Sequence, residues 1–321
     1  MKLFHFSTLL KVAKRLNAIV YPDSSNFGRN WKMFPNKGYS NKLIYDALTG
    51  QAPCMIARLG ATELYCLTNY IGVKKPFKSY KGFIKGLTPP WWWESSMIHQ
   101  MQEWSGFFPA KIDKLEQFCE LMIKEMPLVD ILGTWLKEER FFEDQLLNAK
   151  KVILEDLEPF FASSPWTKAL EGKNVLVVHP FAESIESQYA NRELLFENGL
   201  LPEFELQTIK AVQSIAGEKT SYQDWFEALD WMKAEISKKD FEVCILGCGA
   251  YGFPLAAYVK RIGKKAIHLG GVTQLLFGIK GKRWESETIY PYSNLFNEHW
   301  IRPGENEKPQ NAIIVEGACY W

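Results

Sequence analysis

Several motifs that would identify a reaction chemistry directly are missing from this sequence. Its six cysteines lie far apart and form no C-x-x-C pair, and no HxH or HExxH pattern offers a metal site. There is also no G-x-S-x-G elbow and no P-loop, because residues 278–282 lack the required spacing. Several cysteines lie inside apolar runs, which indicates small buried residues in a reducing compartment rather than disulfides or a zinc site.

Charge excess and long apolar runs are missing as well. The 321 residues include 38 Lys and Arg against 37 Asp and Glu, so the formal net charge of +1 gives no support for a nucleic-acid partner. No apolar run approaches the length of a membrane span, and Lys11, Lys14 and Arg15 interrupt the first segment, which is therefore not a secretory signal. With 47% hydrophobic residues, we expect a cytoplasmic globular protein with a sizeable core.

The sequence does contain apolar strand-like runs that alternate with helical periodicity. This alternation predicts an α/β protein with a mostly parallel, Rossmann-like sheet flanked by helices. We expect residues 1–50 to form a helical and loop extension and residues 51–321 to form one domain. Strands are expected at 54–58, 129–132, 174–178, 204–212 and 243–246, from Lys265 onward, and at the sheet edge at 312–315. Helices are expected at 42–48, 61–70, 112–126, 138–148, 183–197, 222–237, 254–262 and 273–277, with a loop at 21–40.

The clearest unit joins a buried strand to a helix through a glycine-rich turn. Val243 to Leu246 is a short apolar run, and Gly247, Gly249 and Gly252 follow it with G-x-G-x-x-G spacing. The first two glycines allow a tight turn and a close backbone approach, and the third lets the helix pack on the strand. Free N–H groups at the start of that helix attract phosphate, so we expect a nucleotide-type ligand beside the turn.

A nicotinamide dinucleotide is the most familiar ligand of this motif. That ligand also needs an acidic residue at the end of the next strand, to hold the ribose hydroxyls. Here the next strand ends in His268-Leu269-Gly270-Gly271, which contains no acid. We interpret this as evidence for another diphosphate ligand, and a turn needed only for packing stays open as the alternative.

Polar residues follow several of the expected strands. Arg58 and Glu63 flank the first strand-to-helix turn, and His179 and His268 end two later strands. In a parallel sheet these ends converge on one crevice, which can hold a diphosphate. Glu63 is the candidate general base, because a carboxylate in a partly closed site can accept the proton of an attacking hydroxyl. The alternatives are a glutamate that balances the helix dipole or pairs with Arg58, and histidines with a structural role.

Two basic segments each allow two interpretations. Lys280, Lys282 and Arg283 can clamp a phosphate or form a solvated loop. The first helix has one apolar face, with its lysines and arginine elsewhere. It can lie on anionic lipid at the inner face of the plasma membrane, or pack on the domain, which we favour. The apolar face comprises Leu3, Phe6, Leu9, Leu10, Ala13, Leu16 and Val20.

Together these stretches resemble a known family. Arg58-Leu59-Gly60-Ala61-Thr62-Glu63 resembles the R-x-G-x-x-E signature of the GT-D fold glycosyltransferases. The stretches 178–181, 247–249 and 268–278 resemble those of polysaccharide-locus members of that group, so the resemblance spans residues 54–284. It implies a GT-D-like fold and transfer of a hexose from a nucleotide sugar, such as UDP-galactose or UDP-glucose. The implied acceptor is a glycan or lipid-linked glycan in surface-polysaccharide or glycoprotein assembly.

The resemblance also implies which residues act. Glu63 is the implied base of an inverting displacement, and the tryptophans at 91–93 are expected to form part of the acceptor wall. Members of the family often hold a divalent metal through an Asp-x-Glu pair, but Ala61 replaces that Asp. One carboxylate is a poor site for Mn²⁺ or Mg²⁺, so we assign no metal ligand and expect weak or no metal dependence. The implied substrate-binding residues are Arg58, Gly60, His179, Ser184, Gln188, Arg192, Gly247, Gly249, Tyr251, Gly252, His268, Gly270, Gly271, Gln274 and Lys280.

Two other classes of function stay open at this point. A nucleotide-dependent oxidoreductase or a nucleotide-sugar modifying enzyme would use the same glycine turn. A non-catalytic subunit that binds a nucleotide sugar or a glycan is the other class, and the missing Asp at position 61 favours it.

Overall fold

Short, mostly apolar runs form one parallel sheet at the centre of the molecule, in the strand order β3-β2-β1-β7-β6-β4-β5. The computed structural model describes residues 2–21, 36–196, 198–285 and 291–321, with side chains from Ser7 onward. Every strand pairing in these ranges is parallel, which confirms the predicted α/β class and a Rossmann-like sheet. The strands are β1 (Cys54–Arg58), β2 (Ile131–Thr134), β3 (Lys150–Ile153), β4 (Asn174–His179), β5 (Glu205–Lys210), β6 (Val243–Leu246) and β7 (Lys265–His268).

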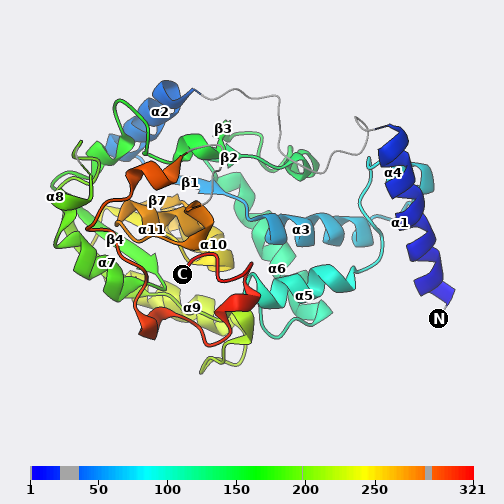
Figure 1. Ribbon diagram of the computed structural model, residues 1–321. Helices are drawn as coiled ribbons and strands as arrows, with labels where there is room; N and C mark the ends of the chain where they lie inside the picture. Colours follow the sequence, from blue (N-terminus) through cyan, green and yellow to red (C-terminus); the bar gives the residue numbers. More distant parts are fainter. Residues whose placement is uncertain (1, 22–35, 197, 286–290) are drawn as a thin grey trace.

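Helices cover both faces of the sheet. In β6, Cys244 and Leu246 contribute to one core layer, whereas Val243 and Ile245 contribute to the other. Because both layers exclude water, the central strands are apolar along their middle, and polar residues such as Arg58 and His268 stand at their ends. The first layer is covered by α3 (Ala61–Lys74), α5 (Ser95–Glu103), α6 (Ile112–Glu125), α9 (Trp225–Ser237) and α10 (Gly252–Arg261). The second is covered by α2 (Lys37–Thr49), α7 (Ala182–Tyr189), α8 (Arg192–Leu195) and α11 (Thr273–Leu276) (Figure 1).

The chain reverses its direction across the sheet between β4 and β6. From β1 to β2, β5 to β6 and β6 to β7 it moves towards β3, with the connecting helices in the first layer. From β4 to β5 it moves the other way, with α7 and α8 in the second layer. All these crossovers therefore have the same hand, as the right-handed crossover rule requires. Ligands of open α/β sheets bind at the carboxyl ends of the strands beside such a reversal.

The N-terminal helix α1 (Lys2–Val20) lies at one end of the molecule and packs against α4 (Tyr80–Ile84) (Figure 1). Leu10 is buried, and Lys11 forms an ion pair with Glu94. The predicted helix and its contact with the rest of the chain are thus confirmed, although part of its apolar face stays exposed. Within the described ranges, no helix combines the length and apolarity needed to cross a bilayer. The predicted loop at 21–40 lies largely outside the described residues.

Two segments lack the helix or strand that their sequence predicts, because a short apolar spacing there resembles that of a regular element. Residues 138–148 contain no α-helix: a 3-10 helix covers Lys137–Phe142 and turns follow it. Their apolar spacing comes from Phe142 and Leu146, which are buried in the first core layer. The predicted edge strand at 312–315 is also wrong, because Ala312–Ile314 form a single 3-10 turn.

Two further differences concern a helix that is divided in two and an edge strand that was not predicted. The predicted helix at 183–197 is divided into α7 and α8 by a break at Ala190 and Asn191. The edge strand β3 has no strand-like pattern, because Lys150 and Lys151 are exposed and only Val152 is buried. A strand with one buried residue carries no apolar run, so sequence alone does not reveal it.

Candidate functional site

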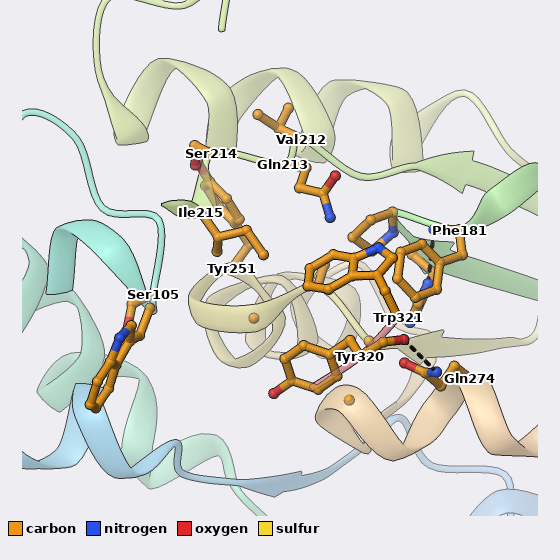
Figure 2. Close-up of a pocket in the computed structure, with 17 residues that line it drawn as sticks. Ser105, Phe181, Val212, Gln213, Ser214, Ile215, Tyr251, Gln274, Tyr320 and Trp321 are labelled. Atoms are coloured by element: carbon orange, nitrogen blue, oxygen red, sulfur yellow. Dashed lines mark hydrogen bonds between the residues drawn. The ribbon is translucent and has the colours of Figure 1, made fainter. Parts of the chain in front are cut away.

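Two adjoining cavities lie along the carboxyl edge of the sheet. The first, here called the arginine cavity, has a volume of about 170 Å³ and lies at the ends of β1 and β7. The second, the aromatic cavity, has a volume of about 100 Å³ and lies at the ends of β4 and β6 (Figure 2). Five residues line both cavities: Trp104, Ser105, Gly249, Gly271 and Tyr320. The second cavity thus occupies the reversal point of the sheet, and the first extends from it.

Arg58 supplies the arginine cavity with a half-buried cation. It is the last residue of β1, and its guanidinium lies over the Trp135 ring, 5.1 Å from the centroid. Gly270 lies beside it at φ +70°, a backbone conformation that favours glycine, and a Cβ there would make an ordinary contact at 3.5 Å from Nη1. Burial lowers the pKa of Arg58, but a guanidinium remains charged in proteins. Among the described residues no group accepts a hydrogen bond from Arg58, so its donors are available to an anion.

Glu63 lies in the same cavity and is equally free of hydrogen bonds from described residues. It is the third residue of α3, and its carboxylate folds back over Gly60. A Cβ at Gly60 would lie 1.8 Å from Oε2, so a larger residue there would displace this carboxylate. The side chain is 8% exposed and makes no ion pair with Arg58 within the described structure. The charge of Glu63 still raises the pKa of Arg58 against the effect of burial, so the two residues interact without a direct contact. Glu63 also lies in the first turn of α3, where the helix dipole favours an anion.

The three glycines of the turn have different roles. A Cβ at Gly247 would lie 2.5 Å from the His179 ring, and a Cβ at Gly252 would lie 2.2 Å from the His268 ring. These two positions are thus glycine because the histidines pack directly on the backbone. Gly249 has φ +57° and no neighbouring atom within 4 Å, so it shapes the turn where the two cavities meet. Gly249, Ala250 and Phe253 bring the start of α10 to the arginine cavity.

His179 and His268 are buried and uncharged at neutral pH. The pKa of each is lowered to about 3, by burial at His179 and by burial together with the charge of Arg58 at His268. His179 Nδ1 accepts a hydrogen bond from the Phe181 N–H at 3.0 Å, which leaves the proton on Nε2. His268 Nδ1 lies 3.2 Å from the Leu246 carbonyl and donates to it. Neither ring can act as a cation for phosphate, but His179 Nε2–H is a neutral donor at the aromatic cavity.

The aromatic cavity is lined by rings with amide groups between them. Figure 2 shows Trp321 and Phe181 side by side, with ring centroids 5.9 Å apart, and the Gln213 amide extending towards them. Gln274 Nε2 donates to the Tyr320 carbonyl at 3.1 Å. Tyr251 closes the cavity on the side of the first core layer, where it stacks on Trp225. The cavity therefore offers flat apolar walls and a few hydrogen-bonding groups, which suits a single planar ring.

The C-terminal segment forms the wall between the two cavities. The Tyr320 ring lies against Gly271, where a Cβ would be 2.4 Å away. Arg283 donates to the Tyr320 hydroxyl at 3.0 Å and forms an ion pair with Glu316. Arg283 is therefore already partnered within the protein, in contrast to Arg58.

The structure brings most of the predicted site residues together. Arg58, Gly60, Glu63, Gly249, His268, Gly270 and Gly271 line the arginine cavity. His179, Gly247, Gly249, Tyr251, Gly271 and Gln274 line the aromatic cavity. Gly252 lines neither cavity, but the His268 ring packs directly on its backbone.

Four predicted substrate-binding side chains lie elsewhere. Ser184 forms a hydrogen bond with Glu307, and Gln188 donates to the Gly278 and His299 carbonyls. Arg192 makes ion pairs with exposed glutamates, and the Lys280 backbone is bonded to Ile301. None of the four lines either cavity. On α7, Ser184 and Gln188 face away from the crevice, because they bond to residues beyond β7.

Several lining residues were not predicted from the sequence. Trp135 directly follows β2, and Gln213 and Ser214 lie in the loop after β5, so the rule that ligands bind at strand ends could have found them. Trp104, Glu316, Tyr320 and Trp321 come from distant segments and carry no local signal. The tryptophans at 91–93 line neither cavity: Trp91 and Trp92 pack edge-on against Phe83.

The carboxylates at this edge do not make a metal site. In the described part of the chain, no three His, Cys, Asp or Glu side chains are grouped so as to hold an ion. Glu63 and Glu316 line the arginine cavity, but Glu316 is bound by Arg283. A hard divalent cation prefers several oxygen ligands, so these side chains do not fit one, and no step below depends on a metal.

The chain matches no protein-family model, no curated protein and no solved structure. The fold class therefore comes from the strand pairing itself, and any function must be argued from the two cavities.

Proposed function

We propose that this protein is a glycosyltransferase that transfers a hexose from a nucleotide sugar to a hydroxyl group of a glycan acceptor. One observation carries the proposal: a half-buried guanidinium that no hydrogen-bond acceptor among the described residues meets and an unbonded carboxylate share one cavity, beside a glycine turn at the start of a helix. The cation and the turn favour a diphosphate. The carboxylate supplies a base at the same place.

The proposed donor lies across both cavities. Its diphosphate contacts Arg58 and the backbone at Gly249, which faces open space. Its base enters the aromatic cavity, whose volume of about 100 Å³ suits a pyrimidine better than a purine. A UDP-hexose is therefore the donor that we propose, with the hexose directed towards Glu63.

The proposed reaction is a single displacement. The acceptor oxygen attacks the anomeric carbon, and Glu63 accepts the hydroxyl proton. The bond between that carbon and the phosphate oxygen breaks, and its electron pair leaves with the nucleoside diphosphate. Arg58 stabilises the charge on the leaving group, and attack from the opposite side inverts the anomeric centre.

Titration calorimetry and UDP release provide the first test, with UDP-glucose, UDP-galactose and NAD⁺ as probes and monosaccharides or water as acceptors. Arg58→Gln should weaken binding of the UDP-sugar by at least about tenfold, because a charge-assisted contact is lost. Glu63→Gln should leave binding intact and lower UDP release by about 100-fold or more, because only the base is removed.

Arg192→Gln is the matched control, because Arg192 pairs with exposed glutamates outside both cavities, and it should behave as the parent. Retention of NAD⁺ in place of UDP-sugars would favour an oxidoreductase and overturn the proposal. Donor binding without transfer or hydrolysis by the parent protein would favour a binding subunit instead.

A further inference from the structure

A cationic, apolar end of the molecule is formed by α1 and the segment 75–87, which contains α4. Neither stretch contains an Asp or Glu, although the whole chain has 37 of them. The two stretches are far apart in sequence, yet α1 packs on α4 (Figure 1). Acid-free, basic sequence is thus concentrated at one end of the fold.

Contacts on one side of α1 fix which of its faces is exposed. Leu10 is buried, the Lys14 ammonium lies 4.8 Å from the Phe83 ring centroid, and Lys11 pairs with Glu94. The opposite face is apolar and open: Leu9 is 68% exposed and Ile19 is 76% exposed. At 100° per residue the exposed apolar residues form one continuous stripe. They are Leu9, Val12, Leu16, Ile19 and Val20.

The segment 75–87 adds both apolar and basic groups. Phe77 is 90% exposed, and Leu87 is exposed as well. An exposed phenylalanine at this level has no role in the packing of the domain. Four exposed lysines alternate with these apolar residues: Lys75, Lys78, Lys81 and Lys85.

We propose that this end of the molecule docks on the surface of an anionic lipid bilayer. The α1 stripe and Phe77 would enter the headgroup region, while the lysines contact lipid phosphates. Charge favours a bilayer over a second copy of the chain, because two such ends would bring like charges together. The association is peripheral, and it is independent of whether the sheet edge binds a nucleotide sugar.

Vesicle flotation of the full chain tests this docking, with phosphatidylcholine vesicles and with vesicles that also contain phosphatidylglycerol. The parent should float with the anionic vesicles and release from them as salt screens the lysines. Lys78→Glu/Lys81→Glu should weaken the association by about tenfold or more, because each surface lysine contributes about a fivefold effect. Leu16→Glu/Ile19→Glu should abolish flotation, because it removes the apolar contact of α1 with the bilayer.

The matched controls place the same changes elsewhere. Leu147→Glu replaces an apolar residue that is 80% exposed outside this end of the molecule, and Lys238→Glu/Lys239→Glu reverses two exposed lysines after α9. Both should float as the parent does, and circular dichroism of every variant confirms its fold. Equal flotation of the parent and the Leu16→Glu/Ile19→Glu variant would overturn the proposal. So would a light-scattering result in which that variant only converts a dimer to a monomer.

Discussion

At the level of single residues, the two arginines of the arginine cavity differ in what they contact. Arg283 is held by Tyr320 and Glu316, so its charge is already compensated. Arg58 lies over an aromatic ring and meets no acceptor among the described residues. The charge of Glu63 favours the charged form of this half-buried group, but its N–H donors stay without an acceptor in the described part of the chain, and a bound anion would supply one. This difference is why Arg58, rather than the 280–283 loop, is the expected phosphate ligand.

His268 allows a prediction about pH and stability. Its pKa is lowered to about 3 in the folded protein, whereas an unfolded chain would titrate near 6.5. Between these values the unfolded chain binds one more proton, so stability rises with pH there and is lost as the pH falls from 6.5 towards 3. On going from about pH 7.5 to about pH 5, His268→Gln should therefore lose about 2 kcal/mol less unfolding free energy than the parent.

Urea denaturation at the two pH values measures this difference between slopes. A uniform loss of stability in the variant does not affect it, because only the change with pH is compared. A slope for His268→Gln equal to that of the parent would show that His268 is not held neutral by burial.

At the level of elements, the turn between β6 and α10 separates the packing role of a glycine from its conformational role. Gly249→Ala adds no contact but places an alanine at φ +57°, which should cost about 1 kcal/mol of unfolding free energy. Gly252→Ala drives a Cβ to 2.2 Å from the His268 ring and should cost about 1–3 kcal/mol through overpacking. Chemical denaturation measures both costs.

Gly263→Ala is the matched control for the turn. Gly263 ends α10 at φ +81° with open space around it, so the backbone cost should equal that at Gly249. Only Gly249→Ala should also weaken binding of the UDP-sugar, because Gly249 alone of the two lines the cavities. Equal donor affinities in the two variants would remove the turn from the proposed phosphate site.

The elements also show which parts of the fold the sequence can reveal. Buried strands such as β1, β4 and β6 are continuous apolar runs, so their positions and their polar carboxyl ends were predicted. The edge strand β3 has one buried residue and gives no such signal. For α7, the sequence shows the helical period but not which side of the helix faces the crevice. Ser184 and Gln188 bond to distant segments of the chain, and these bonds set its orientation. Helix orientation is set by tertiary contacts that a local pattern does not contain.

At the level of the whole molecule, the site is completed by the end of the chain described. Trp321 lies against Phe181, which follows β4, and its carbonyl accepts a hydrogen bond from Arg302 at 2.9 Å. Tyr320 meets Gly271, which follows β7. Residues 312–315 were expected to extend the sheet as an edge strand, yet the segment 312–321 closes its ligand edge. Their role depends on which surface they cover, and nothing in their own sequence specifies that surface.

The Tyr320 ring gives the last prediction, because it divides the two cavities. Ligand pockets commonly enclose about 300–1,000 Å³. The separate volumes of about 170 and 100 Å³ are smaller, so a nucleotide sugar that spans both requires this ring to move. Tyr320→Ala removes that requirement and should tighten UDP-sugar binding severalfold, by about 1 kcal/mol for a side chain that no longer has to be reordered.

Tyr320→Phe keeps the ring and removes only its hydroxyl group, which accepts a hydrogen bond from Arg283. This variant keeps the wall, so titration calorimetry should give it the affinity of the parent. Weaker binding by Tyr320→Ala would mean instead that the donor stacks on the ring, and the ring would then belong to the binding surface rather than to a partition. The direction of the change in affinity thus decides between two roles of the Tyr320 ring. Either it must move before one donor can occupy both cavities, or it is part of the surface that binds the donor.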